Sequence, residues 1–238
     1  MARLIGVVGP SGSGKTTGLR NLDPKQTVIV QPNSKSLPWK GAKNNFSLLK
    51  ISEKTGNLVR TDKLEKLPAI IKHIDEERPD IKYLIFDDFT HFFNSRTQSN
   101  DFRSKTAGGA AFKKYADLAA DTFTALFKYE LELRSDLTMI HHFHVEIGED
   151  VNGAIRQLLK TPGKLLDREI DVPSYYTYLL FTVVLGVKEV DNNNERYKYL
   201  TNDDGVRPAK TPMGCFDKLL VPNDMYEVIK KIEEYESN

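Results

Sequence analysis

Glycine, lysine and threonine residues near the start of the chain have the types and spacing of a phosphate-binding loop. An apolar run, Leu4–Val8, is followed by Gly9–Thr16 with the pattern G-x-x-x-x-G-K-T. Glycines let the backbone curl so that successive N–H groups point at an anion. Lys15 can reach the β- and γ-phosphates of a nucleotide, and the Thr16 hydroxyl can bind Mg²⁺. The residues expected to bind the phosphates are Gly9, Pro10, Ser11, Gly12, Ser13, Gly14, Lys15, Thr16 and Thr17.

The residues on both sides of this loop favour a nucleotide site. The apolar run is typical of a buried strand, and Thr17–Asn21 can continue a helix whose unpaired N–H groups would face the same phosphates. The alternative is a glycine-rich turn before a helix, without a ligand. The strand–loop–helix context disfavours this alternative, so we expect ATP and Mg²⁺ as ligands.

A second chemical feature is an apolar run that ends in two carboxylates. Ile81–Phe86 is typical of a strand, and Asp87 and Asp88 follow it. A carboxylate at the tip of such a strand can hold Mg²⁺ directly or through water, and we assign this role to Asp87. Asp88 has two interpretations. It orients or deprotonates an attacking water, or it caps a helix that starts at Phe89.

Three histidines lie close together in the segment Leu137–Glu146, which we expect to be one strand. Strand alternation puts His142 and His144 on one face and His141 on the other, and no cysteine pattern accompanies them, which disfavours a zinc site. A polar residue at the strand tip would lie near the γ-phosphate, so His144 is the candidate sensor of hydrolysis. The alternative is a strand-end histidine with satisfied hydrogen bonds. The expected catalytic residues are Lys15, Asp87, Asp88 and His144.

Composition indicates a single domain in a reducing compartment. The chain has 238 residues, of which 39% are hydrophobic, and residues 1–238 suit one α/β domain. With Cys215 as the only cysteine, no internal disulfide can form. The first expected strand begins almost at Met1, which leaves no room for a signal peptide, and the longest apolar run, Tyr175–Val187, is too short to span a bilayer. We therefore expect a cytoplasmic protein without a membrane partner.

Basic charge is concentrated in two segments although the net charge is only +1. Residues 94–114 carry five basic residues against one acidic residue, and residues 152–168 carry four against one. A mobile basic loop with aromatic residues can grip a phosphate backbone and stack bases. Phe102 in the first segment has two interpretations, base stacking or core packing. The candidate DNA-binding residues are Arg96, Arg103 and Lys105.

Hydrophobic periodicity predicts the remaining elements of an α/β domain. The expected strands are Thr27–Gln31, Phe46–Ile51, Leu58–Arg60 and a hairpin of Tyr176–Val190 with Glu195–Thr201. The expected helices lie within Asp62–Glu77, within Ala111–Arg134 with Phe112 and Phe123 in the core, and after Asp224. A polar turn is expected at Gly148–Gly153 and a basic loop entering a short helix at Leu158–Arg168.

With these motifs the chain resembles the small RecA-like ATPases of bacteriophages, also described as phage nucleotide-binding or AAA-family proteins. The likeness runs along most of the chain. The Lys-Thr-x-Gly-Lys and Lys-Thr-Pro-Met-Gly elements are more particular than the generic phosphate-loop motifs. The segments that carry the resemblance are Gly9–Thr16, Lys35–Gly41, Leu84–Asp88, His144–Glu146, Lys160–Asp167, Ala209–Phe216 and Val221–Asp224.

The resemblance implies a RecA-like P-loop NTPase core, with a mostly parallel sheet, helices on both faces and a C-terminal β-hairpin. It also implies ATP hydrolysis, a homo-oligomeric ring or filament, and work on single-stranded DNA in recombination, replication or repair in the host cytoplasm. In such assemblies a basic residue of the neighbouring subunit often completes the ATP site, and Lys160 and Lys164 match that position. Asp88 departs from the pattern, because a small hydroxyl residue often stands there, and the catalytic base stays open.

Two other functions use the same phosphate loop. A small-molecule or nucleoside kinase would use the basic residues as a lid over a phosphate acceptor. A non-catalytic assembly factor would bind ATP to control association. Phosphate-loop proteins divide on whether a strand is inserted beside the loop's own strand. Along the chain, Thr27–Gln31 lies between the loop strand and the acidic strand, which favours the RecA/AAA side over the kinase/GTPase side.

Overall fold

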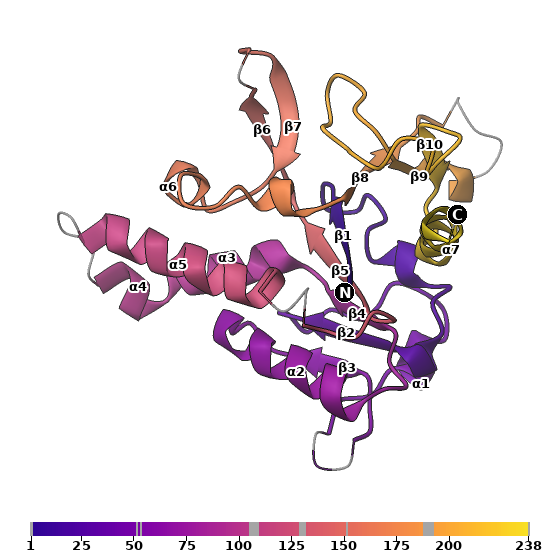
Figure 1. Ribbon diagram of the computed structural model, residues 1–238, viewed down its shortest axis with the longest axis horizontal. Helices are drawn as coiled ribbons and strands as arrows, with labels where there is room; N and C mark the ends of the chain where they lie inside the picture. The colour runs from indigo at the N-terminus through magenta and orange to yellow at the C-terminus, as the bar shows by residue number, and fades with distance from the viewer. Residues whose placement is uncertain are drawn as a thin grey trace.

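The structure, a computed structural model, describes residues 2–50, 52, 54–104, 110–128, 132–150, 152–187 and 193–237. Its centre is an eight-stranded, mostly parallel sheet (Figure 1). Within the described residues the strands are β1 (Arg3–Val8), β2 (Thr27–Gln31), β3 (Leu58–Arg60), β4 (Tyr83–Phe86), β5 (Thr138–Phe143), β6 (Val145–Glu149), β7 (Ile155–Leu159), β8 (Tyr178–Val184), β9 (Tyr197–Leu200) and β10 (Leu220–Pro222).

The order of the strands in the sheet is β10-β9-β8-β1-β5-β4-β2-β3. From β8 to β3 all neighbours pair in parallel, and β9 and β10 add an antiparallel edge. The strand inserted between the loop strand β1 and the acidic strand β4 is therefore β5, not β2, which lies on the far side of β4. Sequence order does not determine this arrangement, because each parallel connection can cross over its neighbours.

The helices within the described residues are α1 (Ala42–Asn45), α2 (Leu67–Glu77), α3 (Phe89–Gln98), α4 (Asn100–Ser104), α5 (Ala110–Leu126), α6 (Lys164–Asp167) and α7 (Met225–Glu236). Short 3-10 helices span Thr17–Leu19, Pro24–Gln26, Leu64–Lys66, Val172–Tyr175 and Asn193–Arg196. In the described part of the chain, none of the helices has both the length and the apolar character needed to cross a bilayer.

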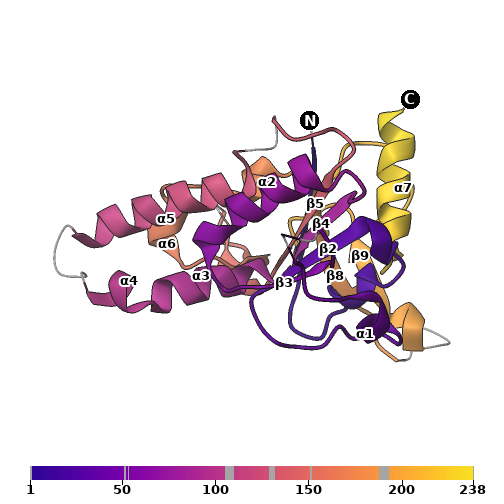
Figure 2. The same ribbon diagram turned by 90° about the horizontal axis from the view of Figure 1, so that it is seen from below.

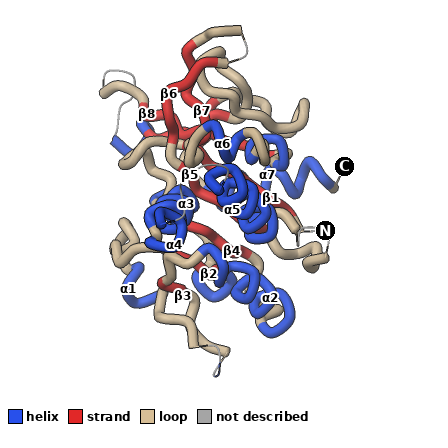
Figure 3. The backbone as a smooth tube through the Cα atoms, turned by 90° about the vertical axis from the view of Figure 1, so that its left-hand side faces the viewer, coloured by secondary structure: helices blue, strands red, loops and turns tan. Residues whose placement is uncertain are grey.

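Helices cover both faces of the sheet. Successive side chains of each buried strand point to opposite faces and are mostly apolar, so both faces need a covering layer. In β4, Leu84 and Phe86 belong to the core shared with α2, α3 and α5, whereas Ile85 belongs to the core shared with α7. Figure 2 shows α2, α3 and α5 on one side of the strands and α7 on the other. Figure 3, seen from the side of α3 and α5, shows the β6–β7 ribbon beyond the end of the main sheet.

Several predicted elements are confirmed. Strands β2 and β3 have the expected bounds, and α2 follows a 3-10 turn with Pro68 in its first turn. Asp224 caps α7 by accepting a hydrogen bond from the Tyr226 N–H. The C-terminal hairpin is formed by β8 and β9. Residues 188–192, which include the end of the first predicted strand and the start of the predicted turn, lie outside the described residues.

Three predicted elements are wrong in type or extent. Of the expected strand Phe46–Ile51, the described residues 46–50 form only isolated bridges, from Leu48 to Leu58 and from Lys50 to Thr55, and Ile51 lies outside the described residues. Helix α5 ends at Leu126 instead of continuing to Arg134. Its residue Phe112 is 58% exposed and Phe123 39% exposed, so neither belongs to the buried core. Figure 2 shows the first turns of α5 extending away from the strands, beside α4.

The predicted strand Leu137–Glu146 is two strands. β5 ends at Phe143, and the chain continues as β6, which pairs with β7 in a separate antiparallel ribbon. The ribbon spans both sides of the turn expected at Gly148–Gly153. It was missed because Ile147 and Ile155, which share one of its faces, are 70% and 72% exposed and give no core pattern.

We predict that Ile140→Ala lowers the free energy of unfolding by about 2–5 kcal/mol, because the Ile140 side chain on β5 is fully buried in the core shared with α7. The matched control is Ile147→Ala on the exposed ribbon, which should change it by less than about 0.5 kcal/mol. Urea denaturation of both variants measures the difference. Equal losses in the two variants would contradict the position of β5 at the centre of the sheet.

Candidate functional site

Hydrogen bonds join the phosphate-binding loop to the strands on both sides of β1. The Gly9 N–H donates to the carbonyl of Phe143 at the end of β5 (3.0 Å). The Thr182 hydroxyl on β8 donates to Ser13 Oγ (2.7 Å), whose own hydroxyl donates to the Pro10 carbonyl (2.7 Å). The loop is therefore held between the two strands that flank β1.

Glycine is required where the loop approaches β8. A Cβ atom at Gly9 would lie 1.7 Å from the Thr182 Oγ1. Gly14 has φ of +93°, a left-handed conformation that favours glycine. Within the described part of the chain, the main-chain N–H groups of six loop residues donate to no protein acceptor, and they are those of Ser11, Gly12, Gly14, Lys15, Thr16 and Thr17. These groups are the donors that an anion-binding loop offers.

The expected helix after the loop is reduced to the three-residue 3-10 helix Thr17–Leu19. Gly18 lowers helix propensity, and Asp23-Pro24 follows too soon for a longer helix to form. Such a short element provides no helix dipole for an anion, so the loop N–H groups and Lys15 are the donors for phosphate. The Lys15 ammonium donates to the carbonyls of Gly9 (2.7 Å) and Pro10 (3.0 Å) of its own loop. Burial lowers the pKa of Lys15, an effect opposed by the charges of Asp88 and Asp87.

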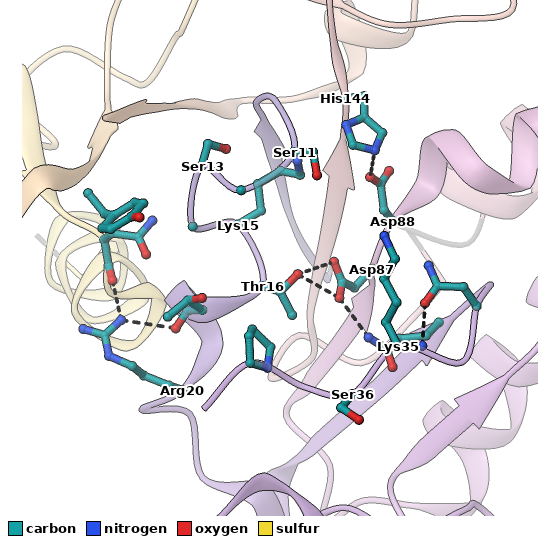
Figure 4. Close-up of a pocket in the computed structure, with 18 of the residues that line it drawn as sticks. Ser11, Ser13, Lys15, Thr16, Arg20, Lys35, Ser36, Asp87, Asp88 and His144 are labelled. Carbon is teal, nitrogen blue, oxygen red and sulfur yellow. Dashed lines mark hydrogen bonds and ion pairs between the residues drawn. The ribbon is translucent and has the colours of Figure 1, made fainter. Parts of the chain in front are cut away.

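Asp87 is the centre of a buried hydrogen-bond cluster at the carboxyl ends of the parallel strands (Figure 4). The Thr16 hydroxyl, 71 positions away in sequence, lies 3.0 Å from both carboxylate oxygens. Gln31 at the end of β2 donates to Oδ2 (3.1 Å), and the His142 Nδ1–H on β5 donates to Oδ1 (2.9 Å). The Thr16–Asp87 pair that the sequence predicts is therefore brought together.

The same cluster keeps Asp87 ionised. Burial opposes the ionisation, since Asp87 is only 6% exposed, but hydrogen bonds from His142, Gln31 and Thr16 hold the pKa of the carboxyl below its ordinary value. An ionised carboxylate beside a threonine hydroxyl is an oxygen donor pair that suits Mg²⁺.

Asp88 and His144 meet beside this cluster. The His144 Nε2 lies 2.7 Å from Asp88 Oδ2, and Figure 4 shows the two side chains facing each other. The second interpretation of Asp88 is confirmed, since its Oδ1 accepts a hydrogen bond from the Thr90 N–H (3.0 Å) and caps α3. His144 follows β5 directly, and its N–H donates to the Thr90 hydroxyl (2.8 Å). Capping does not remove Asp88 from the site, because its other oxygen still faces the cavity residue His144.

These residues line one cavity of about 1120 Å³. The phosphate loop forms one wall, and Asp87, Asp88 and His144 form another. Lys35 and its loop face them, and Tyr197, Asn223 and neighbouring residues of β9 and β10 close the far side. The Arg20 guanidinium donates to the Asn223 carbonyl (2.7 Å), which ties the segment after the loop to the start of α7.

The three histidines of the segment Leu137–Glu146 have different partners, since His142 contacts Asp87 and His144 contacts Asp88. His141 points away from His142 and is hydrogen-bonded to the Tyr176 hydroxyl (2.6 Å). Burial lowers the pKa of His141 to about 3. His141 is therefore a neutral core residue.

Among the residues predicted to act outside the nucleotide site, those that the structure describes do not line the cavity. Lys160 and Lys164 are exposed, at the base of the β6–β7 ribbon and at the start of α6. Arg96 lies over the Phe102 ring (5.7 Å) and 3.6 Å from Asp101. Arg103 is exposed on α4, and Lys105 lies outside the described residues.

Phe102 packs in the core and is not available to stack a base. It is 6% exposed and contacts the Tyr115 ring edge-on, with a centroid distance of 5.4 Å. Of its two interpretations, core packing is therefore confirmed. In the second basic segment, residues 152–168, part of the positive charge is neutralised within the chain. Arg156 forms ion pairs with Asp203 and Asp150.

Sequence reasoning missed several site residues, among them Arg20, Gln31, Lys35 and His142. The sequence could have indicated Gln31, since it is a polar residue at the end of an apolar strand, and Asp87 likewise lies at the end of β4. His142 is fully buried, and its role depends on β5 lying beside β4. No local pattern in the sequence predicts that β5 lies beside β4.

Comparison with protein-family models found no match to the chain, and comparison with curated proteins found none either. The residues and geometry described above are therefore the basis for assigning a function.

We predict that Gly9→Ala lowers the free energy of unfolding by about 1–3 kcal/mol, because the new methyl group overlaps the Thr182 hydroxyl. The double variant Gly9→Ala/Thr182→Ala should recover part of this loss relative to the sum of the single variants. Urea denaturation of the four proteins in the cycle measures the coupling. Strict additivity would show that the loop does not pack against β8 as described.

Proposed function

We propose that the chain is an Mg²⁺-dependent ATPase with a single RecA-like domain, acting as a homo-oligomer on single-stranded DNA. The observation that carries the nucleotide half is the meeting of Thr16 and Asp87 at 3.0 Å beside a loop in which most N–H groups have no acceptor among the described residues. The position of β5 between β1 and β4 supports a RecA-type core over a kinase-type core.

Each residue of the site has a distinct task in this proposal. The loop N–H groups and Lys15 bind the phosphates and stabilise charge that develops on them. Thr16 and Asp87 supply oxygen ligands for Mg²⁺, which when bound neutralises phosphate charge. Gln31 and His142 hold the Asp87 carboxylate in place. Asp88 orients the attacking water and His144, fixed to Asp88, senses the γ-phosphate.

The DNA half of the proposal is supported by the path of α3. This helix begins at Asp88 in the cavity, carries Arg96 in its last turn and is followed by α4 with Arg103. A change at Asp88 is therefore transmitted through one helix to the basic segment. Lys160 and Lys164 are exposed and do not line the cavity of their own chain. We therefore assign them to the ATP site of a neighbouring copy in a ring or filament.

We predict that the chain binds Mg-ATP and releases phosphate without an added acceptor. Lys15→Ala should lower the turnover about a hundredfold or more, because it removes a charged donor from the phosphates. The matched control is Lys25→Ala, an exposed lysine in the 3-10 turn Pro24–Gln26 that does not line the cavity. Calorimetry and a phosphate-release assay measure both steps. Phosphate transfer that requires an acceptor would favour the kinase, and tight binding with no turnover would favour the assembly factor.

We predict that single-stranded DNA binds at low salt in the presence of Mg-ATP and shifts the protein to a larger assembly. The double variant Arg96→Ala/Arg103→Ala should weaken the binding and reduce the slope of log K against log salt by about 1.4, because two cations that neutralise DNA phosphates are removed. Lys66→Ala/Lys72→Ala, at the start of α2 and on it, removes the same charge elsewhere and should leave the slope unchanged. Fluorescence anisotropy and size-exclusion chromatography measure both effects. An unchanged slope in the α3–α4 variant would remove DNA from the proposal.

A further inference from the structure

A group of three potential metal ligands lies at the edge of the cavity, beside the Thr16–Asp87 pair. It consists of Asp88, His91 and His144, and one ligand atom from each lies within 4.8 Å of the other two. Asp88 caps α3, His91 lies in the first turn of that helix, and His144 follows β5. The sequence did not indicate this group, because His91 and His144 are 53 positions apart and come together only through the β4–β5 pairing.

We propose that Asp88, His91 and His144 form a binding site for a transition-metal ion of the zinc class, separate from the oxygen ligands of Mg²⁺. Imidazole nitrogens suit Zn²⁺ and its neighbours in the first transition row, whereas Mg²⁺ prefers oxygen ligands. A set of two imidazoles and one carboxylate therefore selects against Mg²⁺. The site is defined by its own ligands and can be tested apart from ATP hydrolysis. An ion bound there would occupy the Asp88 and His144 atoms and would replace the roles that the proposed function gives them toward water and the γ-phosphate.

The distances require only small movements of side chains. Bonds of about 2.0–2.1 Å in a tetrahedral site place ligand atoms about 3.3 Å apart. The His144 Nε2 and Asp88 Oδ2, now 2.7 Å apart, would separate slightly, and His91 would approach them. The His91 ring already stands edge-on to the His144 ring, with centroids 5.7 Å apart.

The backbone that carries the three ligands is fixed by other hydrogen bonds. The Thr90 N–H donates to Asp88 Oδ1 (3.0 Å), which leaves Oδ2 for a metal. The His144 N–H donates to the Thr90 hydroxyl (2.8 Å), and the His91 N–H donates to the Asp88 carbonyl (3.2 Å). The strand end and the helix start are thus joined through Thr90, and a preorganised set of ligands binds metal without rearranging the chain.

The site would keep one coordination position open to the cavity. Asp88, His91 and His144 all line the cavity that also contains the phosphate loop. Catalytic zinc sites have three protein ligands and a water or substrate in the fourth position. A closed structural site would instead need a fourth protein ligand, and the group found among the described residues has three.

A simple ion pair between Asp88 and His144 is the competing explanation, and it accounts for two of the three residues. It gives no role to His91. The effect of His91 on metal affinity therefore separates the two explanations.

The test is calorimetric titration of the tag-free full chain with Zn²⁺ alone, and then with Co²⁺ as a spectroscopic probe. We expect one Zn²⁺ per chain, Co²⁺ bands in the visible range typical of tetrahedral nitrogen and oxygen ligands, and no displacement by Mg²⁺. His91→Ala should weaken Zn²⁺ binding by at least about tenfold and abolish the Co²⁺ bands, since even outer-shell changes cost 10- to 100-fold.

The matched control is His73→Ala on α2, which should bind Zn²⁺ as the wild type does, because His73 does not line the cavity. Thermal unfolding of each variant shows whether it is folded, and the wild-type Co²⁺ spectrum tests the ligand set without any substitution. A sulfur-to-cobalt charge-transfer band would move the site to Cys215. That band, equal Zn²⁺ affinity in His91→Ala and wild type, or no Zn²⁺ binding by the wild type would each overturn the proposal.

Discussion

The structure depends on one buried carboxylate, Asp87, and on the three donors that keep it charged. A buried charge without partners is costly, so Asp87 can sit at the tip of β4 only if neighbouring elements supply hydrogen bonds. Each neighbour supplies one, through Gln31 from β2, His142 from β5 and Thr16 from the loop after β1. The strand order and the site are therefore one arrangement, because a different neighbour for β4 would remove a donor from Asp87.

The parts of this arrangement that sequence predicts are those encoded locally. The loop Gly9–Thr16 has a fixed spacing, and Asp87 follows an uninterrupted apolar run, so both could be assigned to one site before the structure was known. Gln31 and His142 could not, because their roles depend on which strands lie beside β4. The sequence placed an inserted strand in this fold, but it pointed to β2 where the structure has β5.

The predicted bounds of helices and strands were wrong where the apolar periodicity of the sequence did not result from burial. Phe112 falls at helical spacing in α5, yet its side chain is exposed. Ile147 and Ile155 are apolar without a core to face, so their ribbon resembled a turn between other elements. Apolar spacing predicts an amphipathic element only when another layer covers it, and the sequence alone does not show where the sheet ends.

Asp88 can be both the cap of α3 and a chemical group of the cavity, because the two roles use different carboxylate oxygens. As the cap of α3 it is fixed by the Thr90 N–H through Oδ1, and this same bond leaves Oδ2 in contact with His144 at the cavity wall. A carboxylate that was free to rotate would serve neither a water nor a metal well, because its position would be averaged over several rotamers. The structural role therefore supports the chemical one. In the proposed function, the start of α3 is also the element through which events in the cavity reach the basic segment around Arg96.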